Sequence, residues 1–436
     1  TTGKGQSLWK KAKVLIPGGN MLLSKRSEMF LPNYWPSYFS KSKGCHVWDL
    51  DGRKLTDLSI MGIGTNILGY GREEVDESVK DVISKGNLST LNCPEEVYLA
   101  EKLLDIHKWA KKVRFARAGG EANSIAIRIA RAATGKEKIA ICGYHGWHDW
   151  YLSTNLRDNS QLQEHLLPGL EPNGVPKGLV GTVIPFSFNN LKEIKEIVDN
   201  NELAAIKMEV QRNDPPNPEF LNTIRLLCDQ KKIVLIFDEC TSGFRETFGG
   251  IHKKFGVNPD MAMFGKALGN GYAITAVIGK DNIMEATQKT FISSTFWTER
   301  IGPAAALKTL EVMEKTKSWE YITSLGIGIK EKWQEIADKN NVNIKQSGIP
   351  SLASFSFISK NNLKYKTFVT QEMLKEGILA GNSIYVSTAH SDKILDQYFD
   401  KLNDLFSQIH LCEIGELNIN DLLIGDVCHS TFKRLN

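Results

Sequence analysis

The chain has 436 residues, of which 42% are hydrophobic and 24% are charged, as is ordinary for a globular protein. A chain of this length is expected to form two domains, with a hydrophobic core large enough to fold without disulfides or structural metal ions. Net charge is +4 and no basic run has interleaved aromatics, which argues against a nucleic-acid partner. Seven scattered cysteines without a Cys-x-x-Cys pair predict reduced thiols and no metal site. Without a signal-peptide pattern or a membrane-length apolar run, we expect a soluble, cytoplasmic protein.

The predicted elements begin with an irregular stretch, because Pro17-Gly18-Gly19 and the prolines at 32 and 36 break any helix. A hairpin is predicted at residues 47–53, where strand formers flank an Asp-Gly turn. From about residue 70, helical periodicity alternates with short apolar runs. This pattern predicts an α/β fold with a doubly wound, mainly parallel sheet and a site at the carboxyl ends of its strands. Strands are predicted at residues 113–115, 139–141, 180–186, 204–210 and 233–237, with helices around 73–84, 95–106, 121–133, 190–199, 218–230 and 302–315.

The chain is expected to form three parts. Residues 1–60 would be an N-terminal segment that packs with a small domain. Residues 61–315 would form a large domain that contains the parallel sheet, and the helix that begins at Gly302 would lead out of it. Residues 316–436 would form the smaller α+β domain.

Lys266 gives the most specific chemical signal, because Asp238 precedes it by 28 positions. A lysine can form an imine with a cofactor aldehyde, and a carboxylate can keep a pyridine nitrogen protonated. Both residues follow apolar strands, where a charge is costly unless it is paired. The two residues therefore predict pyridoxal 5'-phosphate (PLP) as the cofactor. The alternatives are a surface lysine and an aspartate that caps a helix or pairs with Arg245. Glu209 closes the neighbouring strand and is expected to reach the site or to pair with Arg245.

Two further motifs follow predicted strands. Ala118, Gly119 and Gly120 open a helix, so their backbone N–H groups predict a phosphate site. The alternative is a tight connection without a ligand. Tyr144 and His145 follow the next strand, and the tyrosine is expected to stack on a flat cofactor ring. The alternative is that these aromatic residues pack a loop against the core.

As a set, these motifs resemble those of the class III PLP-dependent aminotransferases, in the branch that is similar to glutamate-1-semialdehyde aminomutase. The resemblance extends from residue 17 to about residue 408. It implies PLP-dependent transferase fold type I, with a large domain built on a seven-stranded-type sheet and a smaller α+β domain. It also implies a homodimer with shared active sites. The matching segments are residues 118–122, 144–146, 238–245, 264–271 and 387–390.

The resemblance assigns roles to individual residues. Lys266 would be the Schiff-base lysine and proton shuttle, Asp238 would face the pyridine nitrogen, and Tyr144 would stack on the ring. A threonine of the neighbouring subunit would contact the phosphate. An ungapped match places Thr295 there, and Thr298 is the alternative.

Several positions depart from the family pattern. The phosphate turn lacks both usual hydroxyl groups, for which Arg117 is expected to compensate. Asn382 stands where the aminomutase branch has a glutamate, and Lys25 stands where it has an arginine. We therefore predict an aminotransferase that moves an amino group from an amino acid donor to a small aldehyde or ketone. The alternatives are an intramolecular aminomutase and a PLP-binding protein without catalysis.

Overall fold

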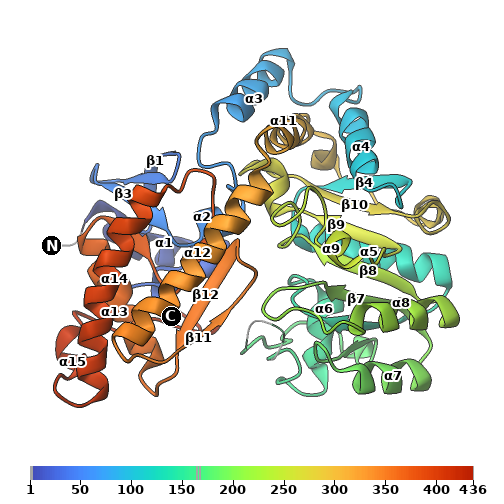
Figure 1. The fold of residues 1–436 in the computed structure, drawn as a ribbon. Helices are drawn as coiled ribbons and strands as arrows, with labels where there is room; N and C mark the ends of the chain where they lie inside the picture. Colours follow the sequence, from blue (N-terminus) through green and yellow to red (C-terminus); the bar gives the residue numbers. More distant parts are fainter. Residues whose placement is uncertain (1–2, 164, 166–167, 436) are drawn as a thin grey trace. The chain divides into compact units, whose positions relative to one another are not determined.

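The computed structural model describes residues 3–163, 165 and 168–435. The chain divides into two compact units (Figure 1). The small unit combines Thr1–Arg72 with Glu320–Asn436, and the large unit is Glu73–Trp319. The predicted division into residues 1–60, 61–315 and 316–436 stays a prediction. None of the helices in the described part of the chain is long and apolar enough to cross a membrane.

A seven-stranded sheet forms the centre of the large unit, in the order β4-β10-β9-β8-β7-β5-β6. Strands β6, β5, β7, β8 and β9 are parallel, whereas β10 is antiparallel to both of its neighbours. The predicted mainly parallel α/β sheet is thus confirmed. The strands are Lys112–Ala116 (β4), Lys138–Cys142 (β5), Val183–Pro185 (β6), Leu203–Glu209 (β7), Val234–Glu239 (β8), Met261–Phe264 (β9) and Thr275–Gly279 (β10).

One predicted strand is shorter than expected. The sequence predicted residues 180–186, but β6 covers Val183–Pro185. The reason is the backbone at Gly181, whose φ of 78° lies in the left-handed region and interrupts an extended run.

Helix α5 (Gly119–Thr134) packs across one face of this sheet, against β4 and β7 to β10. Its alanine and isoleucine side chains form a buried core with Val234 and Ile236 of β8. Alternate strand residues share a face, so Asp238 lies on the same face as these two. The other large-unit helices are Glu73–Lys85 (α3), Glu95–Ile106 (α4), Asp149–Leu152 (α6), Leu191–Asn200 (α7), Phe220–Lys231 (α8), His252–Phe255 (α9), Asp281–Met284 (α10) and Ile301–Thr316 (α11).

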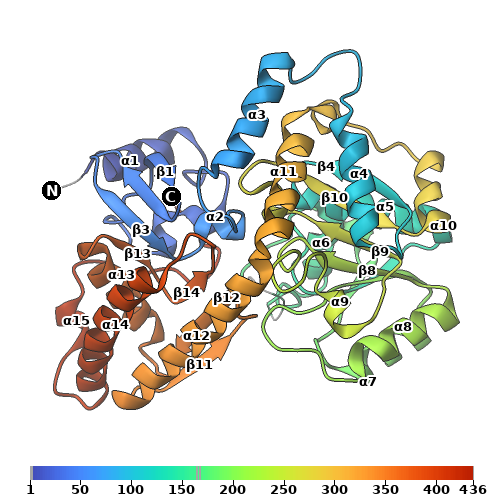
Figure 2. The same cartoon turned by 45° about the horizontal axis from the view of Figure 1, so that its top comes forward.

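The small unit contains a four-stranded sheet, β1-β2-β3-β13, and a three-stranded sheet, β11-β12-β14. Strands β2 and β3 form the predicted hairpin. Strand β13 pairs in parallel with β3 (Figure 2), so residues near both ends of the chain share one sheet. The strands are Phe39–Lys43 (β1), His46–Asp49 (β2), Lys54–Leu58 (β3), Ile344–Ser347 (β11), Leu352–Phe357 (β12), Ile378–Ala380 (β13) and Ser383–Tyr385 (β14); the helices are Lys4–Leu15 (α1), Met61–Gly64 (α2), Asn362–Lys375 (α13), Asp392–Glu413 (α14) and Ile419–Leu422 (α15), and Ser318–Lys339 (α12) begins at the end of the large unit.

Within the small unit, the C-terminal residues form hydrogen bonds with the N-terminal segment. The Tyr34 hydroxyl donates a hydrogen bond to the Ile424 carbonyl at 3.1 Å. The backbone N–H of His429 donates to the Glu28 carbonyl at 2.7 Å. The segment after Leu417, for which the sequence offered no function, therefore fastens the N-terminal segment in place.

Candidate active site

Three ionisable side chains lie at the carboxyl ends of neighbouring parallel strands. Glu209 of β7 pairs in register with Asp238 of β8. Asp238 pairs with Met263 of β9, and Lys266 follows β9 in the 3₁₀ turn η5, Lys266–Gly269. The carboxyl ends of parallel strands meet at one edge of a sheet. The fold therefore brings together the lysine and the aspartate that the sequence singled out.

The Asp238 carboxylate is buried and makes polar contacts through both oxygens. Oδ2 accepts a hydrogen bond from Lys207 Nζ at 3.0 Å and lies 2.9 Å from His145 Nδ1. Oδ1 accepts from the backbone N–H of Cys240 at 3.1 Å. Burial alone would raise the pKa of Asp238, but the charge of Lys207 outweighs it and holds that pKa far below its usual range. The carboxylate therefore stays ionised at neutral pH.

Lys266 presents an amine with unusual proton affinity. Its Nζ donates a hydrogen bond to Thr241 Oγ1 at 3.0 Å. Burial, together with Arg212 and Arg245, lowers the pKa of Lys266 to about 8. At pH 7.5, roughly a quarter of such amines are neutral, against roughly one in a thousand at an ordinary lysine pKa. The Lys266 backbone has a φ of 34°, a strained value for a residue with a side chain.

Glu209, at the end of β7, contacts residues of the loops that follow β5 and β7. Its Oε1 pairs with Arg212 at 2.9 Å, and its Oε2 accepts a hydrogen bond from the backbone N–H of Tyr144 at 3.1 Å. Gly143 makes this contact possible, because a Cβ there would lie 2.5 Å from Glu209 Oε2. Arg212 also donates to Thr241 Oγ1 at 3.0 Å. The carboxylate is thus connected through Arg212 to the hydroxyl that the lysine amine contacts.

The predicted phosphate turn forms the start of helix α5. Gly119 is the first helical residue and Ala118 is the N-cap. The Glu121 carboxylate accepts a hydrogen bond from the backbone N–H of Ala118 at 2.9 Å. The N–H groups of Gly119 and Gly120 belong to the first turn, where they have no partner within the helix. These two groups, at the positive end of the helix dipole, suit an anion.

The Arg117 guanidinium, which the sequence suggested as compensation at the phosphate turn, pairs with Glu299. Its Nε donates to Glu299 Oε1 at 2.9 Å and its Nη2 donates to the Glu299 carbonyl at 2.7 Å. Its charge is therefore already matched by a carboxylate that lies 182 residues away in the sequence. Arg117 joins the end of β4 to the segment that precedes α11.

The Cys240 side chain lies between the phosphate turn and the lysine turn. Its Sγ is 4.0 Å from the position that a Cβ would take at Gly119, and 3.5 Å from that at Gly265. Burial raises the pKa of the Cys240 thiol well above its usual value. A neutral thiol thus packs the two turns together.

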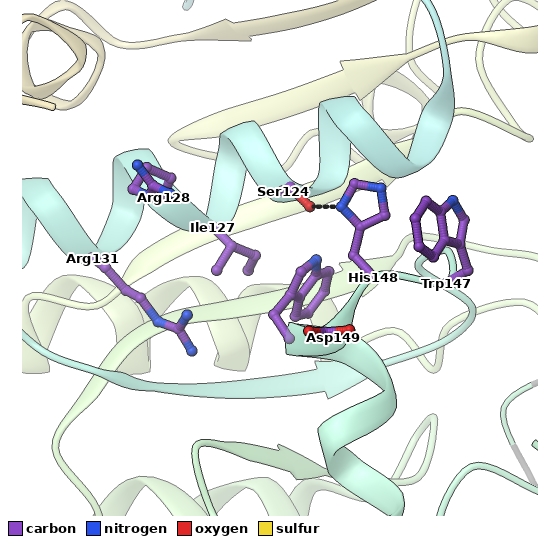
Figure 3. A pocket seen from close by; sticks show the side chains of 8 residues that line it. Ser124, Ile127, Arg128, Arg131, Trp147, His148 and Asp149 are labelled. Carbon is purple, nitrogen blue, oxygen red and sulfur yellow. Dashed lines mark hydrogen bonds between the residues drawn. The ribbon is translucent and has the colours of Figure 1, made fainter. Parts of the chain in front are cut away.

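The loop after β5 covers the first turns of α5 (Figure 3). His148 Nδ1 and Ser124 Oγ are 2.5 Å apart. A Cβ at Gly120 would lie 3.2 Å from His148 Nε2 and 3.4 Å from Trp147 Nε1. The glycine therefore allows the loop to approach closely. The adjoining pocket of about 490 Å³ is lined by α5 and this loop, and none of the predicted cofactor residues lines it.

The two residues of the Tyr-His motif lie at different depths. Tyr144 is half-buried, and its ring meets Tyr151 edge-on with centroids 6.0 Å apart. Burial raises the pKa of Tyr144, so its hydroxyl is neutral. His145 is fully buried against Asp238, and its Nε2 lies 3.0 Å from the Cys142 carbonyl oxygen. His145 therefore acts on any ligand through Asp238.

Thr295 begins the 3₁₀ turn η7, Thr295–Thr298, and is exposed. Thr298 Oγ1 donates a hydrogen bond to the Thr295 carbonyl at 2.7 Å. Two exposed aromatic side chains flank these threonines, Phe291 at 84% and Phe296 at 71% exposure.

Lys207 is a candidate site residue that the sequence analysis missed. Its side chain is fully buried and it is the ion-pair partner of Asp238. A signal was present, because Lys207 is the lysine within an otherwise apolar run from Leu203 to Met208. A buried lysine requires a partner, and the sequence did not indicate which carboxylate that would be.

The residues at this edge fit PLP. Asp238 stays ionised for a protonated ring nitrogen, and Lys266 has an amine of lowered pKa for the aldehyde. Gly119 and Gly120 offer backbone N–H groups for the phosphate, and Tyr144 offers an aromatic ring.

The positions that departed from the aminomutase pattern lie in the small unit. Lys25 is exposed at the end of a short 3₁₀ turn. Arg26 donates to the Lys433 carbonyl at 3.0 Å. Asn382 Nδ2 donates to the Phe355 carbonyl at 2.8 Å, so its amide supports the three-stranded sheet.

The chain is similar to known proteins over most of its length. The chain is 31% identical to the 3-aminobutyryl-CoA aminotransferase of Cloacimonas acidaminovorans, over 93% of this chain and 97% of the relative. It is also 31% identical to the glutamate-1-semialdehyde 2,1-aminomutase of Sulfurisphaera tokodaii, over 93% of this chain and 100% of the relative. An omega-transaminase from Sphaerobacter thermophilus has the same fold, with a TM-score of 0.82, 23% identity and coverage of 94% and 98% of the two chains. The model of the family "Aminotransferase class-III" matches residues 32–409. The chain therefore belongs to the class III aminotransferases, a family of PLP-dependent enzymes.

Proposed function

We propose that this enzyme transfers an amino group from an amino acid to a small aldehyde or ketone, with Lys266 as the residue that holds PLP. One observation carries the proposal. The Lys266 amine, whose pKa is lowered to about 8, stands at the same sheet edge as the buried and ionised Asp238. When bound, PLP supplies an electron-accepting ring that stabilises negative charge on the carbon of an attached amine.

Asp238, Lys266 and Thr241 would have different roles in the reaction. Asp238 binds the ring nitrogen and keeps its proton in place. Lys266 would hold PLP, and its Nζ would serve as the general base and acid that moves the proton of the donor. Thr241 Oγ1, which accepts a hydrogen bond from Nζ at 3.0 Å, orients the amine for this transfer.

The phosphate is expected to bind the N–H groups of Gly119 and Gly120 together with a threonine of a second subunit. Thr295 and Thr298 lie in an exposed segment beside exposed Phe291 and Phe296, as a subunit interface would require. Thr298 already donates its hydroxyl proton to the Thr295 carbonyl, which favours Thr295 as the phosphate ligand. We therefore propose a homodimer with shared active sites.

The aminotransferase is favoured over the aminomutase by the small unit. Asn382 stands where the aminomutase branch has a glutamate, and its amide donates a hydrogen bond to the Phe355 carbonyl. Lys25 stands where that branch has an arginine. A lysine is a point charge, whereas a guanidinium can bind a carboxylate through two hydrogen bonds. The similarity to a 3-aminobutyryl-CoA aminotransferase favours the same choice. The aminomutase remains the second candidate because a named aminomutase is 31% identical to the chain.

Donor dependence tests the proposal. Purified protein is loaded with PLP and given single amino acids, and the released cofactor and the oxo acid are separated by chromatography. An aminotransferase converts PLP to pyridoxamine phosphate with one oxo acid formed per cofactor. An aminomutase isomerises glutamate-1-semialdehyde without an external donor. A protein that binds no PLP would contradict the proposal.

A further inference from the structure

Three buried ionisable side chains meet at the Asp238 carboxylate. Lys207 Nζ lies 3.0 Å from Asp238 Oδ2 and 3.0 Å from His145 Nδ1, and the last two atoms are 2.9 Å apart. Lys207 and His145 are fully buried, and Asp238 is 4% exposed. We infer that Lys207 supplies the positive charge behind Asp238, so that His145 is a neutral imidazole with its proton on Nε2.

The sheet register fixes the position of Lys207. It pairs with Ile236, two residues before Asp238 on β8, so both side chains lie on the face that α5 covers. Lys207 therefore reaches Asp238 from deeper in the sheet, and the outer side of the carboxylate faces the site.

The hydrogen bonds of His145 determine its tautomer. Nε2 lies 3.0 Å from the Cys142 carbonyl oxygen, which can only accept, so Nε2 carries a proton. A neutral ring then has a lone pair on Nδ1, and the Lys207 ammonium donates both to this lone pair and to Asp238 Oδ2. Nδ1 and Oδ2 are then two acceptors 2.9 Å apart, and the contact is favourable because Lys207 donates to both. Without Lys207, a second proton on the ring would be required, so that Nδ1 could donate to Oδ2.

Among the described residues, the other titratable side chains in contact with His145 or Asp238 are not cations. Tyr151 meets the His145 ring with centroids 5.7 Å apart, and Cys240 adjoins Asp238. Burial raises the pKa of Tyr151 and of Cys240, so both are neutral. Glu209 adds a carboxylate at the end of β7, and Lys266 belongs to the turn η5. Burial and Lys207 lower the pKa of His145 to about 4, in agreement with a neutral ring.

Lys207 is thus a positioning residue for the cofactor. The charge behind Asp238 is supplied by Lys207 and not by the imidazole of His145. Oδ2 is held by the protein, and Oδ1 accepts one backbone hydrogen bond, which leaves lone-pair capacity on Oδ1 for the ring nitrogen. This last consequence depends on the proposed role of Asp238, whereas the state of His145 does not.

The test is NMR of the full chain labelled with ¹⁵N-histidine, without cofactor, from pH 5.5 to 8.5. The chain has nine histidines, and the signal that disappears in His145→Gln identifies the ring. We expect a neutral ring with the proton on Nε2 throughout in the wild type and in Lys207→Arg. In Lys207→Met we expect a doubly protonated ring at pH 5.5 that loses one proton as the pH rises. Lys280→Met removes a lysine that pairs with Asp260 at 2.8 Å, and serves as the control with an unchanged His145 signal.

A doubly protonated His145 in the wild type at pH 7, or an unchanged ring in Lys207→Met, would overturn the inference. If Lys207→Met does not fold, the wild type and Lys207→Arg still decide it. A second readout uses the absorbance of bound PLP. Lys207→Met should add a titration step between pH 5.5 and 8.5 that the wild type lacks. Failure to bind PLP in both proteins would count against the proposed function, and the NMR result would stand independently.

Discussion

Replacing Asp238 by Asn should destabilise the protein through the lysine that it leaves behind. Lys207 Nζ is fully buried, 3.0 Å from the carboxylate. At that distance two unit charges attract by about 5 kcal/mol at an effective dielectric constant of about 20. Removing one partner of a buried pair costs about 3–5 kcal/mol, because the remaining charge stays in the interior. We expect Asp238→Asn to lower the free energy of unfolding by about that amount, a large part of the total stability of about 5–15 kcal/mol.

The assay is urea-induced unfolding of the cofactor-free chain at pH 7.5, followed by tryptophan fluorescence. Asp238→Asn, Lys207→Met and the double variant form a double-mutant cycle. In the double variant no buried charge is stranded, so we expect it to recover most of the loss, with a coupling of at least about 2 kcal/mol. The control is the exposed pair Lys80–Glu77, whose loss should cost at most about 1 kcal/mol. A destabilisation of Asp238→Asn below about 1 kcal/mol, or additive single effects, would refute the reasoning.

Four further predictions address the site. Lys266→Ala should abolish amino transfer with an unchanged circular dichroism spectrum, as should Lys266→Arg, and near-normal turnover in either variant would contradict the assignment. The rate at which cofactor-free protein takes up PLP should rise with pH and level off above about pH 8, because the neutral Lys266 amine is the reactive form; a rate that is independent of pH would argue against it. Gly143→Ala should lower the melting temperature more than Gly135→Ala, because only the first places a Cβ 2.5 Å from Glu209 Oε2, whereas both positions have a positive φ; equal losses in thermal denaturation would show that the contact is loose. Thr295→Ala should weaken PLP binding by about tenfold, the value of roughly one charge-assisted hydrogen bond, and an unchanged dissociation constant in equilibrium dialysis would remove this hydroxyl from the phosphate site.

The sequence predicted the parts of the fold that local patterns determine. Runs of branched aliphatic residues alternate with helical periodicity, which indicates a parallel sheet with its site at one edge. That rule was sufficient to place Asp238 and Lys266 at the same edge of the sheet. The antiparallel strand β10, Thr275–Gly279, was not predicted, because strand direction depends on the chain path rather than on local composition.

The side-chain partners could not be predicted in the same way. Lys207 reaches Asp238 because the register of β7 on β8 places it two residues deeper on the same face. Arg117 reaches Glu299 across 182 residues of sequence. Each pairing depends on which strand face and which loop meet in three dimensions, and a single sequence does not contain that information in any local pattern.

The most direct test of the central claim is to locate the cofactor on the chain. Protein loaded with PLP is reduced with borohydride, digested and analysed by peptide mass spectrometry. We expect one phosphopyridoxyl group per chain, on Lys266. Its attachment to another lysine, above all to Lys207 beside the same aspartate, or its absence from the chain, would contradict the account.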